Sequence, residues 1–98
     1  MSEFSLSQVI VSQEGDQLYT LEYVASLTTT STLIIERLIE LGLIEPIGSM
    51  LRQSDITRIA QIQRLRQDLG LNLVGAAMVL DMAQEIAQLK ARLQAYRN

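Results

Sequence analysis

Cysteine, histidine and tryptophan are absent from this sequence of 98 residues, and it contains a single proline. Without cysteine or histidine, the chain cannot build a zinc finger, an iron–sulfur site or a thiol nucleophile. The absence of disulfides is typical of a cytoplasmic protein, which is the location we expect. No positive charge precedes an N-terminal apolar stretch, and no apolar run approaches the about 20 residues that span a bilayer. We therefore expect no metal site and no membrane span.

A catalytic constellation is also missing. The five glycines match neither nucleotide-binding fingerprint, so the sequence predicts no cofactor. Glu36 and Glu40 are carboxylates four residues apart, but such pairs on an exposed helix are usually solvated charges rather than an acid and a base. We expect no catalytic residues, and we expect that the protein is not an enzyme.

Charge is distributed unevenly along the chain. Residues 1–50 contain seven acidic side chains and one arginine, whereas residues 51–98 contain seven basic and four acidic side chains. DNA is a polyanion whose binders usually supply many lysines and arginines to its phosphates. An acidic first half therefore favours a basic protein as the partner.

The composition predicts one folded domain, because 48% of the residues are hydrophobic and the chain is short. We divide it into an N-terminal extension over residues 1–18, a helix-turn-helix region over 19–70 and a C-terminal helix over 71–98. Within the extension, residues 6–11 are rich in β-branched side chains and precede a turn at 14–16. They predict a short strand or an ordered tail that covers the core. The fold class is otherwise all-α.

Two short helices are expected after this extension. Thr20 is a suitable N-cap for a helix through Leu27, and the three threonines at 28–30 interrupt the helical pattern. A second helix is expected over residues 31–41, with Gly42 as the left-handed residue that ends it. Two short helices joined by a tight polar turn form a helix-turn-helix unit.

Two longer helices are expected in the second half of the chain. Ser54 is a suitable N-cap for the third helix, which Gly70 ends, and Asn72 caps a fourth helix that runs to Tyr96. The fourth helix carries apolar residues at alternating steps of three and four, the spacing of a coiled-coil seam. This stripe either packs on the chain's own core or forms a homodimer, and we favour the dimer. The seam residues are Val79, Met82, Ile86, Leu89, Leu93 and Tyr96.

The stretch from Tyr19 to Pro46 resembles the helix-turn-helix of MerR-type regulators, and the likeness continues to Ala76. DNA-binding members of that family usually carry an arginine-threonine-leucine-arginine-tyrosine-tyrosine block in the second helix. Residues 33–38 of this chain read Leu-Ile-Ile-Glu-Arg-Leu, so both arginines of the block are replaced. An acid repels phosphate and a leucine offers no hydrogen bond to a base edge, so DNA is an unlikely partner. Arg37 and Arg52 remain as candidate phosphate contacts.

Among MerR-like proteins, the chain most resembles the chaperone-modulator family, the CbpM type. Members are about 100 residues long, have a degraded recognition helix and share a pattern that reads here Arg64-Leu65, Asp68-Leu69, Leu71-Asn72 and Gly75. The resemblance implies a protein that binds the J-domain of a DnaJ-like, curved-DNA-binding (CbpA-type) co-chaperone and restrains its stimulation of Hsp70. J-domains present a basic helix to Hsp70, which an acidic surface could mask.

We expect this partner-binding surface on and around the second helix, as an acidic face with an apolar centre. Two alternatives remain: a dimeric DNA-binding regulator like the heat-shock-repressor branch of the MerR family, and a dimerisation or adaptor module that binds neither J-domain nor DNA. A J-domain pull-down beside a DNA gel shift discriminates the three. The expected partner-binding residues are Glu22, Leu33, Ile35, Glu36, Glu40 and Glu45.

Overall fold

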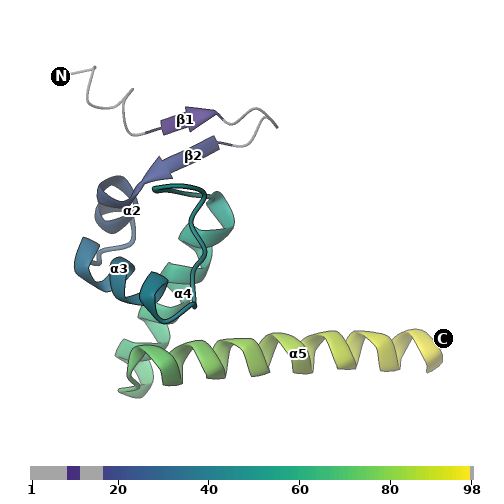
Figure 1. The fold of residues 1–98 in the computed structure, drawn as a ribbon. Coiled ribbons are helices and arrows are strands. Elements are labelled where there is room, and N and C mark those ends of the chain that lie inside the picture. Colours follow the sequence, from purple (N-terminus) through teal and green to yellow (C-terminus); the bar gives the residue numbers. More distant parts are fainter. Residues whose placement is uncertain (1–8, 12–16, 98) are drawn as a thin grey trace.

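A computed structural model describes residues 9–11 and 17–97, with side chains over 17–97, and within these ranges the chain forms four helices and three short strands. The helices are α2 (Leu21–Leu27), α3 (Thr32–Glu40), α4 (Gln53–Leu69) and α5 (Leu73–Arg97). Figure 1 shows α2, α3 and α4 gathered under the strands, while α5 extends away from them. The predominantly helical fold, a helix-turn-helix followed by a third helix and a long C-terminal helix, is confirmed.

The strands form one antiparallel sheet in the order β1 (Val9–Val11), β2 (Gln17–Thr20) and β3 (Met50–Leu51). The strand expected within residues 6–11 is confirmed at 9–11, whereas residues 6–8 and the turn at 14–16 lie outside the described residues. Strands β2 and β3 were not expected. Tyr19 of β2 pairs with Leu51 of β3, so the sheet joins the start of the helix-turn-helix to its end.

The helix-turn-helix forms where the capping residues predict it. Thr20 Oγ1 accepts a hydrogen bond from the Tyr23 amide at 3.2 Å, and Ser31 Oγ accepts one from the Ile34 amide at 3.3 Å. Between the two helices, Thr29 adopts a left-handed backbone with φ of 56°. Gly42 has φ of 74° just after α3, where glycine is the residue that tolerates it.

The start of α4 differs from the expectation. The helix begins at Gln53 after Arg52, and Ser54 is therefore already inside the first turn rather than at the N-cap. Asp55 does the capping instead, because its carboxylate accepts a hydrogen bond from the Arg52 amide at 2.9 Å. At the next junction Asn72 caps α5 as expected, with Oδ1 accepting from the Gly75 amide at 2.7 Å.

The core lies between the helix-turn-helix, β3, α4 and the first turns of α5. Ile35 is completely buried in it, so the expectation that Ile35 forms part of an exposed partner-binding face is wrong. The cause is helical geometry: Ile35 and Leu38 lie three residues apart on the side of α3 that faces the core, opposite the charged positions. The largest fully buried side chains are Val24, Ile35, Leu38, Leu51, Ile59 and Ile62.

Helix α5 contributes to this core only at its N-terminal end, through Ala76, Ala77 and Leu80. Every residue from Asp81 to Arg97 is exposed, and Figure 1 shows this part of α5 projecting beyond all other elements. Between α4 and α5 the chain bends by 109°. Over the described residues, no single helix is both long and apolar enough to cross a bilayer, and only α4 and α5 taken together pass that test.

Candidate protein-binding surface

The exposed face of α3 is the first part of the candidate surface. Leu33 is 74% exposed, and Glu36, Arg37 and Glu40 are exposed beside it. Steps of three, four and seven residues place these four side chains on one side of the helix. The face therefore has an apolar residue beside two acids and one base.

Arg37 does not act as a free cation on this face. Its Nη1 donates to Glu40 Oε2 at 3.1 Å, and both side chains are largely exposed. Such a surface pair contributes at most about 1 kcal/mol to stability, so a ligand could break the hydrogen bond. The Glu40 carboxylate would still lie close to Arg37 and would offset its positive charge. Among the described residues Glu36 has no ion-pair partner. The local charge of the α3 face is therefore negative.

The two expected acids outside α3 also lie on the surface. Glu22 is exposed in the first turn of α2, and Glu45 is exposed in the segment that follows α3. Neither forms an ion pair within the described part of the chain. The structure therefore places five of the six expected partner-binding residues on the surface and removes Ile35 from it.

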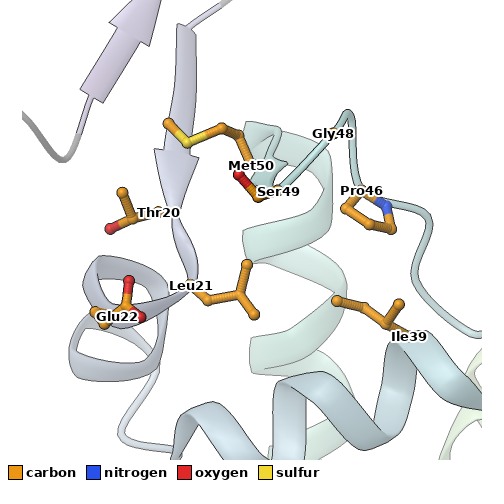
Figure 2. Close-up of a pocket in the computed structure, with 8 residues that line it drawn as sticks. All are labelled: Thr20, Leu21, Glu22, Ile39, Pro46, Gly48, Ser49 and Met50. Atoms are coloured by element: carbon orange, nitrogen blue, oxygen red, sulfur yellow. The ribbon is translucent and has the colours of Figure 1, made fainter.

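A groove that the sequence did not reveal borders this face. It lies between the start of α2, the end of α3 and the turn that leads to β3, and its volume is about 440 Å³. Figure 2 shows Leu21 and Ile39 pointing toward one another across it, with Pro46 and Met50 on the side of the turn. We call it the α2–α3 groove; the residues that line it are Thr20, Leu21, Glu22, Ile39, Pro46, Gly48, Ser49 and Met50.

The hairpin of residues 47–50, beside this groove, lies where a winged helix-turn-helix protein has its wing. The Ile47 amide donates to the Met50 carbonyl at 2.9 Å and the Met50 amide to the Ile47 carbonyl at 3.0 Å, so the hairpin has only two residues at its tip. Gly48, the first of these, has φ of 61°. Just beyond the turn, the Arg52 guanidinium lies 3.9 Å from the Asp55 carboxylate. The wing is thus too short to reach far from the domain.

Arg58 fixes the orientation of α5 relative to the helix-turn-helix. Its Nη1 and Nη2 reach the Asp81 carboxylate at 2.7 and 3.4 Å, and its Nε donates to the Leu43 carbonyl at 2.9 Å. The hydrogen bonds that Asp81 accepts from Arg58, together with the positive charge of that guanidinium, lower the pKa of Asp81 below its usual value of 3.8. The sequence offered no signal for this contact, because the three residues are far apart along the chain.

The expected seam of α5 lies on the projecting part of the helix. Val79 is half-buried, whereas the five seam residues beyond it are between 52 and 90% exposed. Large apolar side chains in a row on a projecting helix are unusual on the surface of a monomer. The side chains concerned are Met82, Ile86, Leu89, Leu93 and Tyr96.

Together the helix-turn-helix, the short hairpin and the long final helix define a regulator of the winged helix-turn-helix class. The profile of the MerR helix-turn-helix family of regulatory proteins matches residues 19–98, so the chain belongs to that family. A regulatory family agrees with the expectation of a non-enzymatic protein.

Comparison with curated proteins gives one relative from Streptomyces coelicolor, which carries the name heat shock protein HspR. It is 29% identical over 84 residues, a match that covers 81% of this chain and 56% of that protein. The chain thus spans little more than half the length of this relative. No solved structure matches the chain significantly.

Proposed function

We propose that this chain regulates by binding another protein, and that the partner is the J-domain of a DnaJ-like co-chaperone, whose stimulation of Hsp70 it restrains in the cytoplasm. One observation carries the proposal: the outward face of α3, the helix that would read DNA, presents Leu33 among Glu36, Glu40 and an arginine already paired with Glu40. This face suits the basic helix that J-domains present to Hsp70, because opposite potentials favour association.

The electrostatics of the surface argue against DNA as the principal ligand. Arg37 and Arg52, the candidate phosphate contacts, each lie within 4 Å of a carboxylate. A phosphate approaching either arginine would meet the negative charge of Glu40 or Asp55. Since DNA affinity depends chiefly on cations that neutralise phosphates, this arrangement weakens it.

The proposed regulator acts as a homodimer joined through α5. The exposed seam residues lie at steps of three and four, and a second copy of the same helix supplies the matching stripe. An isologous contact of this kind leaves the α3 faces of both copies free. The dimer would then hold two J-domain sites.

The test is a titration of the full chain with the J-domain of a DnaJ-like co-chaperone, by isothermal calorimetry at low and high salt. We expect binding that weakens with salt and falls at least about tenfold in the variant Glu36→Lys with Glu40→Lys, because the reversed charges repel a basic helix. Glu85→Lys, a reversal on exposed α5, is the control. Unchanged affinity of the double variant in low salt would contradict the proposed surface.

A second candidate function, a dimeric DNA-binding regulator, is favoured by membership of the MerR family and by the similarity to the protein named HspR. A gel shift with duplex DNA at increasing salt distinguishes it from the first. Retardation of DNA without J-domain binding would replace our proposal by this alternative. Binding to neither ligand would indicate the dimerisation or adaptor module.

A further inference from the structure

We propose that the α2–α3 groove receives the apolar face of a basic amphipathic helix, and that it is the anchoring site for the partner helix. Its identification with a J-domain helix rests on the function proposed above, whereas the preference for a basic amphipathic helix rests on the groove itself. The occupant would insert apolar side chains between α2, α3 and the turn at residues 47–50, and would place its lysines or arginines over the acidic rim.

The floor of the groove is apolar and only partly covered. Leu21 of α2, Ile39 of α3, Met50 of β3 and Pro46 in the segment after α3 are all half-buried and line it. Covering such side chains removes apolar surface from water, which is the main favourable contribution to association. Leu21 and Ile39 line opposite sides of the groove of about 440 Å³ (Figure 2), so an apolar side chain of a partner can enter between them.

Few polar groups are available inside the groove. Thr20 Oγ1 already accepts the capping hydrogen bond from the Tyr23 amide, and Glu22 and Ser49 are exposed at the margin. Small polar ligands are usually held by several converging polar groups, which this site does not offer. The chemistry of the lining therefore selects an apolar surface rather than a metabolite.

One acid lines the groove, and a second lies near it on α3. Glu22 belongs to the lining on the α2 side. Glu36 is outside the lining and precedes Ile39 by three residues on α3, toward the solvent side of that helix. Neither glutamate has an ion-pair partner in the part of the chain that the structure describes. A basic amphipathic helix carries its charges beside its apolar stripe, and Glu22 at the groove with Glu36 farther out on α3 offers the opposite charge.

The basic residue of α3 lies on the other side. Arg37 lines a separate cavity with Leu41 and Arg66, toward the junction of α4 and α5. That side of α3, with Arg37 and Arg66, is therefore less favourable for a basic partner than the groove side. The charge asymmetry around one helix thus sets where on α3 a basic ligand lies.

A helix fits this site better than an extended peptide. β3 is the edge strand of the sheet, but it has two residues, and the Met50 amide and carbonyl already bond to Ile47. A strand added at this edge would find no row of free backbone groups to pair with. A helix satisfies its own backbone and needs only the apolar floor and the acidic rim.

The experiment records ¹⁵N-HSQC spectra of the full chain with two probes: the J-domain, and a synthetic helical peptide of about 18 residues with leucines on one face and lysines on the other. We expect both to shift the amides that line the groove, Leu21, Glu22, Ile39, Ser49 and Met50 among them. A matched peptide with glutamates in place of lysines should leave them unshifted. Shifts confined to α5, or equal binding of the acidic peptide, would overturn the proposal.

Variants separate the groove from the α3 face. Met50→Ser and Glu22→Lys should each weaken both probes about five- to tenfold, whereas the controls Met78→Ser and Glu85→Lys on exposed α5 should change them less than twofold. Glu22 is exposed, so its substitution tests the groove even if Met50→Ser perturbs folding.

The outcomes distinguish the two proposals. If the J-domain binds and both groove variants bind it normally, the groove proposal fails and the α3 face remains. If the lysine peptide binds in the groove while the J-domain does not bind the chain, the groove proposal stands and the identity of the partner under the proposed function fails.

Discussion

Helix α3 and the distal half of α5 both carry apolar residues three positions apart, but one set of side chains is buried and the other is exposed. In the helix-turn-helix, Ile35 and Leu38 stand three residues apart and are almost completely buried. In the distal half of α5, Ile86 and Leu89 stand three residues apart and are 54 and 53% exposed. Spacing therefore identifies which side chains share a helix face, but only the neighbouring elements decide whether that face is covered.

This difference in burial gives the two regions different roles, one in stability and the other in association. The buried residues between Val24 and Leu80 build a core whose loss would unfold the domain, whereas residues 81–97 add exposed apolar surface that is available for association. Substitutions in the first region should change the free energy of unfolding, and substitutions in the second should change the monomer–dimer equilibrium.

The largest effect is expected inside the core. Ile35→Ala should lower the free energy of unfolding by about 2–5 kcal/mol, because it leaves a cavity where Ile35 is fully buried. The neighbouring Leu33→Ala, at a position 74% exposed, should change it by less than about 0.5 kcal/mol. Urea denaturation followed by circular dichroism at one protein concentration measures both. Equal losses would mean that the assignment of faces on α3 is wrong.

A smaller effect, of a different kind, is expected on the α5 seam. Leu89→Glu should raise the dimer dissociation constant by about thirtyfold, or about 2 kcal/mol, because the dimer would bury the new carboxylate. Gln88→Glu adds the same charge beside the seam and serves as the control. Sedimentation equilibrium gives the constants. A wild-type chain that stays monomeric, or identical constants for the two variants, would refute the seam.

The junction between the two regions should respond more modestly. Arg58→Met removes the hydrogen bonds to the Leu43 carbonyl and to Asp81, and we expect a loss of about 1–2 kcal/mol in unfolding free energy. Arg64→Met removes an exposed guanidinium from the same helix and should have little effect. Thermal melts of the three proteins compare them. A similar shift in both variants would show that the junction contact contributes nothing specific.

The smallest effect concerns pH. The pKa of Asp81 is lowered in the folded chain, so its contribution to stability is present above the unfolded pKa of about 3.8 and is lost as the pH falls through the folded value. Asp81→Asn should therefore be less stable than wild type at pH 7, by less than about 1 kcal/mol because Asp81 is exposed, and the gap should be smaller at pH 3 than at pH 7. Urea titrations at the two pH values measure it. A gap that is the same at both pH values would show that the ion pair is not its cause.

Most of the helix ends could be predicted from capping residues and glycines in the sequence. Thr20, Gly42, Gly70 and Asn72 mark helix ends through hydrogen bonds and backbone angles that involve only nearby residues, so the sequence located these ends correctly. Ser54 failed as a cap because Asp55, one residue later, accepts the Arg52 amide. Which of two adjacent residues caps a helix depends on the direction from which the preceding chain enters the helix. The spacing of residues in the sequence does not define that direction.

The remaining features depend on contacts between distant residues. β2 and β3 form because Tyr19 meets Leu51, and the α2–α3 groove exists because Leu21 and Ile39 are brought together from different helices. The burial of Ile35, in contrast, could have been predicted from the sequence. The charges at 36, 37 and 40 mark the solvent side of α3, and the position of Ile35 lies away from them.

The bend between α4 and α5 makes the last helix a spacer of defined length. At about 1.5 Å per residue, the seam from Val79 to Tyr96 extends about 25 Å, and if the two copies of α5 pair antiparallel this length sets the distance between the two helix-turn-helix units. Deleting seven residues from the projecting part would keep the seam on the same side and shorten the spacer by about 10 Å. Deleting two would rotate everything beyond the deletion by about 200° and carry it to the opposite side. The register of α5, and not its length alone, therefore determines how two copies are oriented toward their ligands.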